Sequence, residues 1–320
     1  MTTLDKLSTR DAFGQALLRV ADASPNVLAF AADTAKSMGL GPMAAKYPDR
    51  VFDVGIAETN MMTAAAGAAS VGNLVFAATY SVFSSMRTAE EVRTFIAYPN
   101  LNVKVVGGMG GLAGTYEGVT HQATEDVGMM RCIPNLAVVV PADADSTEVI
   151  TEKLAEYAGP VYLRLGRYAV PKVFGMDYEF VLGKANVVKG AGTDATVICN
   201  GVMVHRALLA EKVLAEKGYS VRVVEMATVK PIDAEAIIES AKLTGAIVTA
   251  EEHNVIGGLG AAVAEVVTTH CPVPMRMVGI NDMFAESGHH EELLDKYGLS
   301  VQDIVKNVLE VISMKTLSKK

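Results

Sequence analysis

Glu58 is the first residue whose setting could support chemistry, because it is the only acid in a predicted helix of very small residues. Residues 51–72 have the pattern of a short strand followed by a helix of mainly Ala, Gly and Ser, which another backbone can approach closely. An acid in the first helical turn complements the helix dipole, and this is the simplest interpretation of Glu58. Its apolar neighbours Ile56, Met61 and Met62 favour burial instead. A buried carboxyl suits hydrogen bonding to a partner better than solvation as a free charge.

His121 is the second candidate, in the glycine-dense residues 107–126. Glycines allow a backbone to approach a ligand closely, and a buried core does not need so many of them. The stretch contains neither a GK[ST] nor a GxGxxG pattern, so a nucleotide site is not favoured. A lone histidine is most often structural. Between Thr120 and Gln122 in such a loop, however, it is a candidate for proton transfer.

The apolar pattern predicts a scaffold that could position both candidates. Near-continuous apolar runs, which we expect to be strands, occur at residues 27–31, 74–78, 103–106, 136–140 and 161–165. Segments of helical period separate them at residues 11–21, 82–96 and 146–157. Buried strands that alternate with helices indicate a parallel sheet covered on both faces. Such sheets bind ligands at the carboxyl ends of their strands, and the candidate residues lie in the segments that follow these ends.

A second series of elements follows a segment richer in Pro, Gly and charge at residues 168–191, where we place a linker. Strands are expected at residues 195–199, 221–225, 246–250 and 275–278, and helices at residues 202–217, 233–243, 260–268, 291–297 and 301–311. The predicted fold class is therefore α/β, with two doubly wound, mainly parallel sheet domains. We expect the domains to span residues 1–185 and 190–320.

Composition excludes several classes of partner. The chain has 320 residues and a formal net charge of -8, with no stripe rich in Lys and Arg, so nucleic acid is not expected to bind. The longest weakly polar run, residues 61–78, is mainly Ala and Gly, whereas a membrane-spanning helix needs ~20 strongly apolar residues. The three cysteines are widely spaced and show no paired-ligand pattern, which favours a cytoplasmic protein.

Four strings, GIAETNM, GVTHQATED, TAEEHNVIGGLG and GINDMFAESG, resemble the transketolase family of thiamine diphosphate enzymes over nearly the whole chain. The resemblance implies a pyrimidine-binding domain followed by a transketolase C-terminal domain. It implies that Glu58 contacts the pyrimidine N1′ and that His121 lies beside the reacting centre. It also implies that Phe83 stacks on the aminopyrimidine with Tyr80 as its neighbour, although an aromatic pair at this spacing is more often core.

The same resemblance implies an anionic ketose as substrate. Arg10, Ser37 and Arg167 match the family's ligands for the anionic end, and arginine offers a planar fork to an oxyanion. Two positions depart from the family. Met109 replaces a second histidine that contacts the substrate, and Tyr116-Glu117 replaces the usual Glu-Asp pair, so that Glu117 is the expected substrate ligand. Because Met cannot donate a hydrogen bond, we infer a changed sugar specificity.

The chain contains no GDG motif, which in this family marks the domain that holds the diphosphate through Mg²⁺. We therefore expect a split transketolase, in which a separate N-terminal subunit supplies that domain and completes the Mg²⁺ site. Two copies of each chain would form a two-plus-two assembly, with every site between unlike chains. A deoxyxylulose-phosphate synthase, a keto-acid dehydrogenase beta subunit and a non-catalytic binding or regulatory homologue stay open as alternatives.

Overall fold

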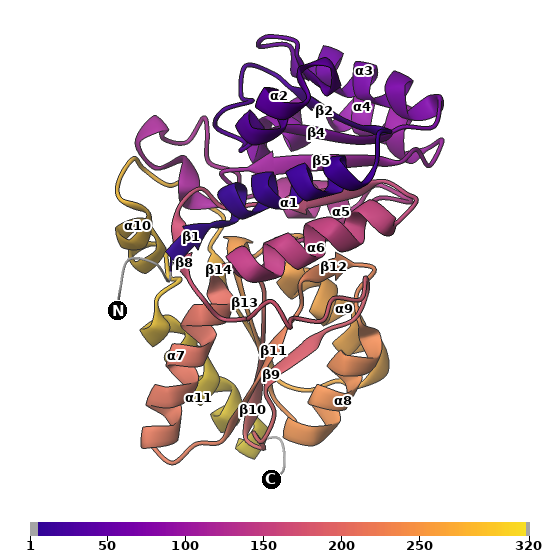
Figure 1. Cartoon of the computed structure of the whole chain (residues 1–320). Helices are drawn as coiled ribbons and strands as arrows, with labels where there is room; N and C mark the ends of the chain where they lie inside the picture. Colours follow the sequence, from indigo (N-terminus) through magenta and orange to yellow (C-terminus); the bar gives the residue numbers. More distant parts are fainter. Residues whose placement is uncertain (1–5, 318–320) are drawn as a thin grey trace.

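The computed structural model describes residues 6–317, which form two α/β units joined end to end. Figure 1 shows the N-terminal unit, in indigo to magenta, above the C-terminal unit, in orange to yellow. Each unit is built on a sheet whose neighbouring strands are mostly parallel. The predicted fold class is confirmed. Across residues 6–317, no helix is both long and apolar enough to span a lipid bilayer.

The first sheet has seven strands in the part of the chain that the structure describes, in the order β12-β6-β7-β5-β4-β2-β3. Their bounds are Val27–Ala31 (β2), Val51–Asp53 (β3), Leu74–Tyr80 (β4), Val103–Gly108 (β5), Ala137–Val139 (β6), Val161–Arg164 (β7) and Thr228–Lys230 (β12). All neighbours pair in parallel except β12 with β6. Because the other six strands point the same way, the loops that follow them meet at one edge.

The helices of the first unit are α1 (Thr9–Ala23), α2 (Gly41–Lys46), α3 (Glu58–Ser70), α4 (Ala89–Glu91), α5 (Asp126–Arg131) and α6 (Ala144–Glu156). Two of them, α1 and α6, begin at residues whose side chains satisfy free backbone N–H groups. Ser8 caps α1, and Asp143 forms a reciprocal capping box with Ser146 at the start of α6. The predicted helix at residues 82–96 is largely π-helical, at Phe83–Arg87 and Val92–Ala97. Such bulges are frequently found at functional sites.

The second sheet has the strand order β14-β13-β10-β11-β9 within the described residues. Its strands are Asn186–Lys189 (β9), Ala195–Cys199 (β10), Val221–Glu225 (β11), Ile247–Asn254 (β13) and Met275–Ile280 (β14). Its helices are α7 (Met203–Glu216), α8 (Ala234–Thr244), α9 (Leu259–His270), α10 (His290–Lys296) and α11 (Val301–Leu317). Every residue of β10 is buried, as expected of a central strand covered on both faces.

The two units share backbone pairing, which the sequence pattern does not reveal. β12 follows the expected domain boundary, yet it pairs with β6 of the first sheet. A short strand at the N-terminus, β1 (Lys6–Ser8), pairs with β8 (Ala169–Pro171) in the connecting segment. The division into residues 1–185 and 190–320 stays a prediction.

Glu225 is a buried carboxyl between the two units and gives a prediction about stability. Its Oε2 accepts hydrogen bonds from the Tyr178 hydroxyl at 2.9 Å and the Asn186 amide at 3.1 Å. Burial raises the pKa of this carboxyl from 4.5 to about 7. The stability that it contributes is therefore fully present below pH 4.5 and is lost as the pH rises through about 7.

We expect Glu225→Gln to remove this pH dependence. At pH 9 the variant should be more stable than the wild type by about 3 kcal/mol, because glutamine cannot ionise. At pH 5 the difference should be small. Urea denaturation of both proteins at the two pH values measures the difference in their free energies of unfolding. The same difference at both pH values would contradict the assignment of this titration to Glu225.

Candidate active site

The candidate residues converge at the carboxyl edge of the first sheet. Ser37 follows β2, Phe83 follows β4, and Arg167 follows β7. Glu58 begins α3 just beyond β3, and the loop that carries His121 follows β5. The parallel order of these strands brings together residues that are far apart in the sequence.

Glu58 is buried at the start of α3, with only 3% of its surface exposed. Met61 and Met62 are fully buried on the same helix, as the sequence suggested. The expectation for Ile56 was wrong, because this residue is 76% exposed in the loop before the helix. The buried Glu58 carboxylate has a charged partner. Nη1 of Arg87 donates to both of its oxygens, at 2.9 and 3.0 Å.

Arg87 is the residue of this site that sequence reasoning missed. Its guanidinium carbon lies 4.4 Å from the centre of the Phe83 ring, so one flat group both covers the ring and hydrogen-bonds Glu58. The arginine side chain is 48% exposed. The only signal in the sequence was a basic residue four positions after Phe83. The Arg87 guanidinium therefore contacts both Glu58 and Phe83, the two residues that the resemblance assigns to the cofactor ring.

Three aromatic rings form a cluster beside this pair. The Phe83 ring lies edge-on to the His121 ring, with centroids 5.3 Å apart, and Tyr80 lies 6.0 Å from each of them. The hydroxyl of Thr120 and Nδ1 of His121 are 3.0 Å apart. Tyr80 and Phe83 are half-buried rather than enclosed, so the pair is not simply core.

An open groove of about 600 Å³ runs past Phe83 and Arg87. Its other lining residues are Val82, Met86, Val119, Thr120, Gln122, Glu125, Phe284 and Ala285. The last two come from the C-terminal unit, so both units form the groove. Across residues 6–317, no three or more His, Cys, Asp and Glu side chains are grouped to hold a metal ion.

The residues expected at an anionic substrate end also lie together. Arg10 donates to the backbone carbonyls of Ser37 at 2.7 Å and Arg167 at 3.3 Å. The Tyr80 hydroxyl donates to Oγ of Ser37 at 3.1 Å. The Arg10 guanidinium thus connects the loops after β2 and β7, and its buried Nε donor has no hydrogen-bond partner among the described residues.

Glu117 and Arg167 form an ion pair at this end. Nη1 of Arg167 contacts both carboxylate oxygens at 2.7 Å. Partial burial favours the neutral acid, but the hydrogen bond and charge of Arg167, together with a backbone hydrogen bond, lower the pKa of Glu117. Met109 is buried, with φ of 57°, and Tyr116 bonds through its hydroxyl to the His289 ring. An anionic group that binds Arg167 must therefore compete with Glu117.

Comparison with known proteins agrees with this geometry. The family model described as transketolase, pyrimidine binding domain matches residues 5–172, and the one described as transketolase, C-terminal domain matches residues 183–304. The chain is 40% identical to the 6-deoxy-6-sulfo-D-fructose transketolase subunit SqwH of Clostridium sp. (strain MSTE9), covering 96% of this chain and 95% of that protein. It is 39% identical to an apulose-4-phosphate transketolase subunit of Phocaeicola vulgatus, covering 96% and 98%.

A solved structure described as "Split gene transketolase, inactive beta4 tetramer" superposes with a TM-score of 0.91 and 47% sequence identity. The match covers 97% of this chain and 99% of that one. The resemblance carried by the sequence motifs is confirmed. The chain belongs to the transketolase family, and it matches the pyrimidine-binding and C-terminal domains found in the subunits of split transketolases.

Proposed function

We propose that this chain is one subunit of a thiamine diphosphate-dependent transketolase that moves a two-carbon ketol unit from an anionic ketose to an aldose. The observation that carries the proposal is that Arg87 links Glu58 to Phe83 and that Phe83 lies against His121, beside a groove lined by Phe83 and Arg87. These side chains offer a buried carboxylate, a stacking face and a proton-transfer group within reach of one another. The family match supports the same reaction class.

Thiamine diphosphate supplies the carbon nucleophile and electron sink for this chemistry when it is bound. Glu58 would hydrogen-bond the pyrimidine N1′ and exchange a proton with it, because the carboxylate is buried and is bound by Arg87, which lines the groove. Phe83, with Tyr80 beside it, would stack on the ring. His121 would move protons to and from the substrate hydroxyls.

Arg10, Ser37 and Arg167 support a ketose with a phosphate or another anionic group. The relatives named above are described as acting on 6-deoxy-6-sulfo-D-fructose and apulose 4-phosphate, and both compounds carry an anionic group. Glu117 would accept a substrate hydroxyl while it restrains Arg167. Because Met109 is buried and cannot donate a hydrogen bond, this end offers one ligand fewer than the family pattern.

The chain would act with a partner. We propose that a separate N-terminal subunit holds the diphosphate and Mg²⁺, since the GDG motif is missing from this sequence. Large apolar side chains beside the groove, Met86, Val119 and Phe284, are 51%, 42% and 77% exposed, as expected of a surface that another chain covers. Self-association of the resulting pair would give a two-plus-two assembly in the cytoplasm.

Co-expression with the polypeptide encoded beside this one tests the proposal. The purified pair should bind thiamine diphosphate and transfer a two-carbon unit from at least one phosphorylated or sulfonated ketose. A pair that assembles but binds no thiamine diphosphate would contradict the proposal and favour a binding or regulatory protein. Transfer of an acyl unit from pyruvate would instead favour a keto-acid dehydrogenase.

Arg87→Ala is expected to tighten thiamine diphosphate binding to the pair by roughly two- to fivefold. The cofactor ring must displace the Arg87 guanidinium from Glu58, and an ion pair whose arginine is half-exposed is worth up to about 1 kcal/mol. Calorimetric titration measures the change. Arg93→Ala, in the same segment but outside the groove lining, is the matched control. Weaker binding by Arg87→Ala would make Arg87 a cofactor ligand rather than a competitor.

A further inference from the structure

We infer that the C-terminal unit sets the position of the active-site loop, residues 110–123, through Glu252 and His290. Neither residue has a role in the reaction proposed above, and their part as positioning residues rests on that proposed function. The loop carries His121 and Glu117, whose geometry decides proton transfer and substrate contact. Contacts from the C-terminal unit hold this loop at its base and at its tip.

The base of the loop is closed by backbone pairing and by one buried arginine. Gly111 and Ala123 exchange two backbone hydrogen bonds, at 2.8 and 2.9 Å, which bring the two ends of the loop together. Nη2 of Arg164 donates to the carbonyls of Ala123 at 2.9 Å and Glu252 at 2.8 Å. The same guanidinium therefore joins the loop to strand β13 of the C-terminal sheet.

Glu252 contacts the first residues of the loop directly. Its Oε1 accepts the backbone N–H of Leu112 at 2.8 Å and Nε2 of His290 at 2.8 Å. Gly111, at φ of +66°, allows this approach, because a Cβ there would lie 2.4 Å from Cδ of Glu252. The carboxylate is thus a bridge between the loop and helix α10, and no larger residue fits at position 111.

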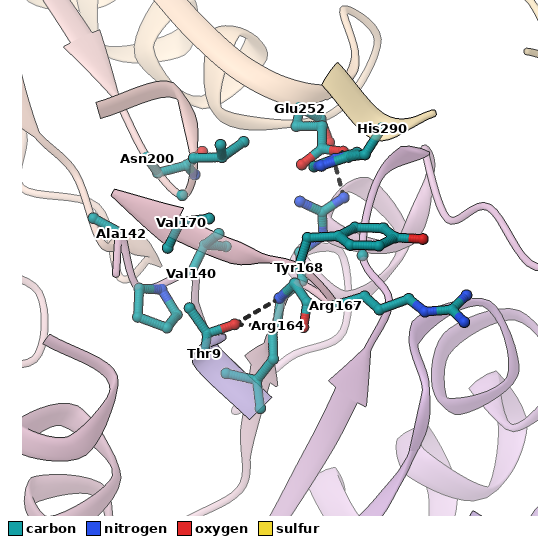
Figure 2. Close-up of a pocket in the computed structure, with 16 residues that line it drawn as sticks. Thr9, Val140, Ala142, Arg164, Arg167, Tyr168, Val170, Asn200, Glu252 and His290 are labelled. Carbon is teal, nitrogen blue, oxygen red and sulfur yellow. Dashed lines mark hydrogen bonds and ion pairs between the residues drawn. The ribbon is translucent and has the colours of Figure 1, made fainter. Parts of the chain in front are cut away.

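His290 extends the bridge to the connecting segment that carries Arg167. Its ring stacks on the Tyr168 ring with centroids 5.3 Å apart and an interplanar angle of 24°. Figure 2 shows His290 and Glu252 together on one side of the cavity, with Tyr168 beneath them. The Tyr168 hydroxyl is 2.6 Å from Oγ1 of Thr115 within the loop. Burial favours neutral His290, but Glu252 outweighs it and raises the pKa of the imidazole.

The tip of the loop is held by the segment that precedes α10. At the tip, the Tyr116 hydroxyl bonds to the His289 ring, and next to the base Nε2 of Gln122 donates to the carbonyl of Glu286 at 3.0 Å. His121 lies between the base and the tip contacts. Because a misplacement of about 1 Å can cost 10²-fold in rate, anchoring the loop to the C-terminal unit would directly affect catalysis.

Hydrogen exchange in the full chain tests this role without any activity. We expect Glu252→Ala to speed amide exchange of residues 111–123 at least about 10-fold, because a charged hydrogen bond at the base of the loop is lost. Glu251→Ala is the matched control. Glu251 is also buried on β13, but its oxygens accept Leu259 and Gly260 at the start of α9, at 2.7 Å each. That variant should speed exchange in α9 and leave the loop unchanged.

A second pair of variants covers the case in which Glu252→Ala does not fold. Glu252→Gln keeps an acceptor of the same size, and His290→Gln keeps a donor, so both should fold and show smaller increases confined to the loop. In the reconstituted pair, each should lower kcat while leaving thiamine diphosphate affinity unchanged, since Glu58 and Phe83 lie outside the loop. Exchange that rises equally in the Glu251 and Glu252 variants, or only outside residues 111–123, would overturn the inference. Because exchange is measured without substrate, its result is independent of the proposed reaction.

Discussion

Replacing Glu58 with glutamine should lower ketol transfer by the reconstituted pair at least ~100-fold, because the variant keeps the shape of the side chain and loses its exchangeable proton. The carboxylate is 3% exposed and lies at the start of α3, so solvent cannot take over its role easily. Glutamine can still hydrogen-bond a ring nitrogen. We therefore expect cofactor affinity to fall much less than the rate.

Glu125→Gln is the matched control for this substitution. Glu125 is an acid that lines the groove, and its carboxylate accepts a hydrogen bond from the N–H of Thr124. If the catalytic role belongs to Glu58 and not to any acid near the groove, replacing Glu125 should change the rate less than about threefold. Initial rates at saturating cofactor and calorimetric titration separate turnover from binding. A Glu58→Gln enzyme with near wild-type turnover would remove Glu58 from the mechanism.

The scaffold could be predicted because its strands are buried on both faces. The runs at residues 27–31, 195–199 and 221–225 coincide with β2, β10 and β11, since a strand covered on both faces is rich in apolar side chains. Short strands such as β1 and β12 were missed. With three residues each, they show no periodicity, and their pairing with distant segments is decided by tertiary contact.

The candidate site could be predicted where residues follow strand ends, and not where side chains meet across the fold. Phe83 and His121 meet because β4 and β5 are neighbours. Arg87 was not predicted as the partner of Glu58, which lies 29 positions away in the sequence. Glu252 was not predicted as a partner of the loop, because Leu112 lies 140 positions away. The exposed Ile56 shows the opposite error, because an apolar residue beside a helix start need not face the core.

Asp126→Ala is expected to lower the free energy of unfolding by about 3–5 kcal/mol. Oδ2 of Asp126 accepts the Tyr162 hydroxyl at 2.7 Å and Nε of Arg164 at 2.8 Å, and both charged side chains are almost completely buried. Removal of the carboxylate leaves the Arg164 charge with the carbonyls of Ala123 and Glu252 as its partners. Urea denaturation of the full chain measures the loss.

Glu265→Ala is the control, because Glu265 pairs with Arg131 at 2.7 Å while its side chain is 65% exposed. An exposed pair contributes less than about 1 kcal/mol, so the two variants should differ by several-fold in destabilisation. Asp126→Asn should fall between them, since the amide oxygen still accepts a hydrogen bond but carries no charge. Equal destabilisation by Asp126→Ala and Glu265→Ala would mean that water reaches Arg164. In that case the arginine could not hold the base of the active-site loop as tightly as its contacts with Ala123 and Glu252 indicate.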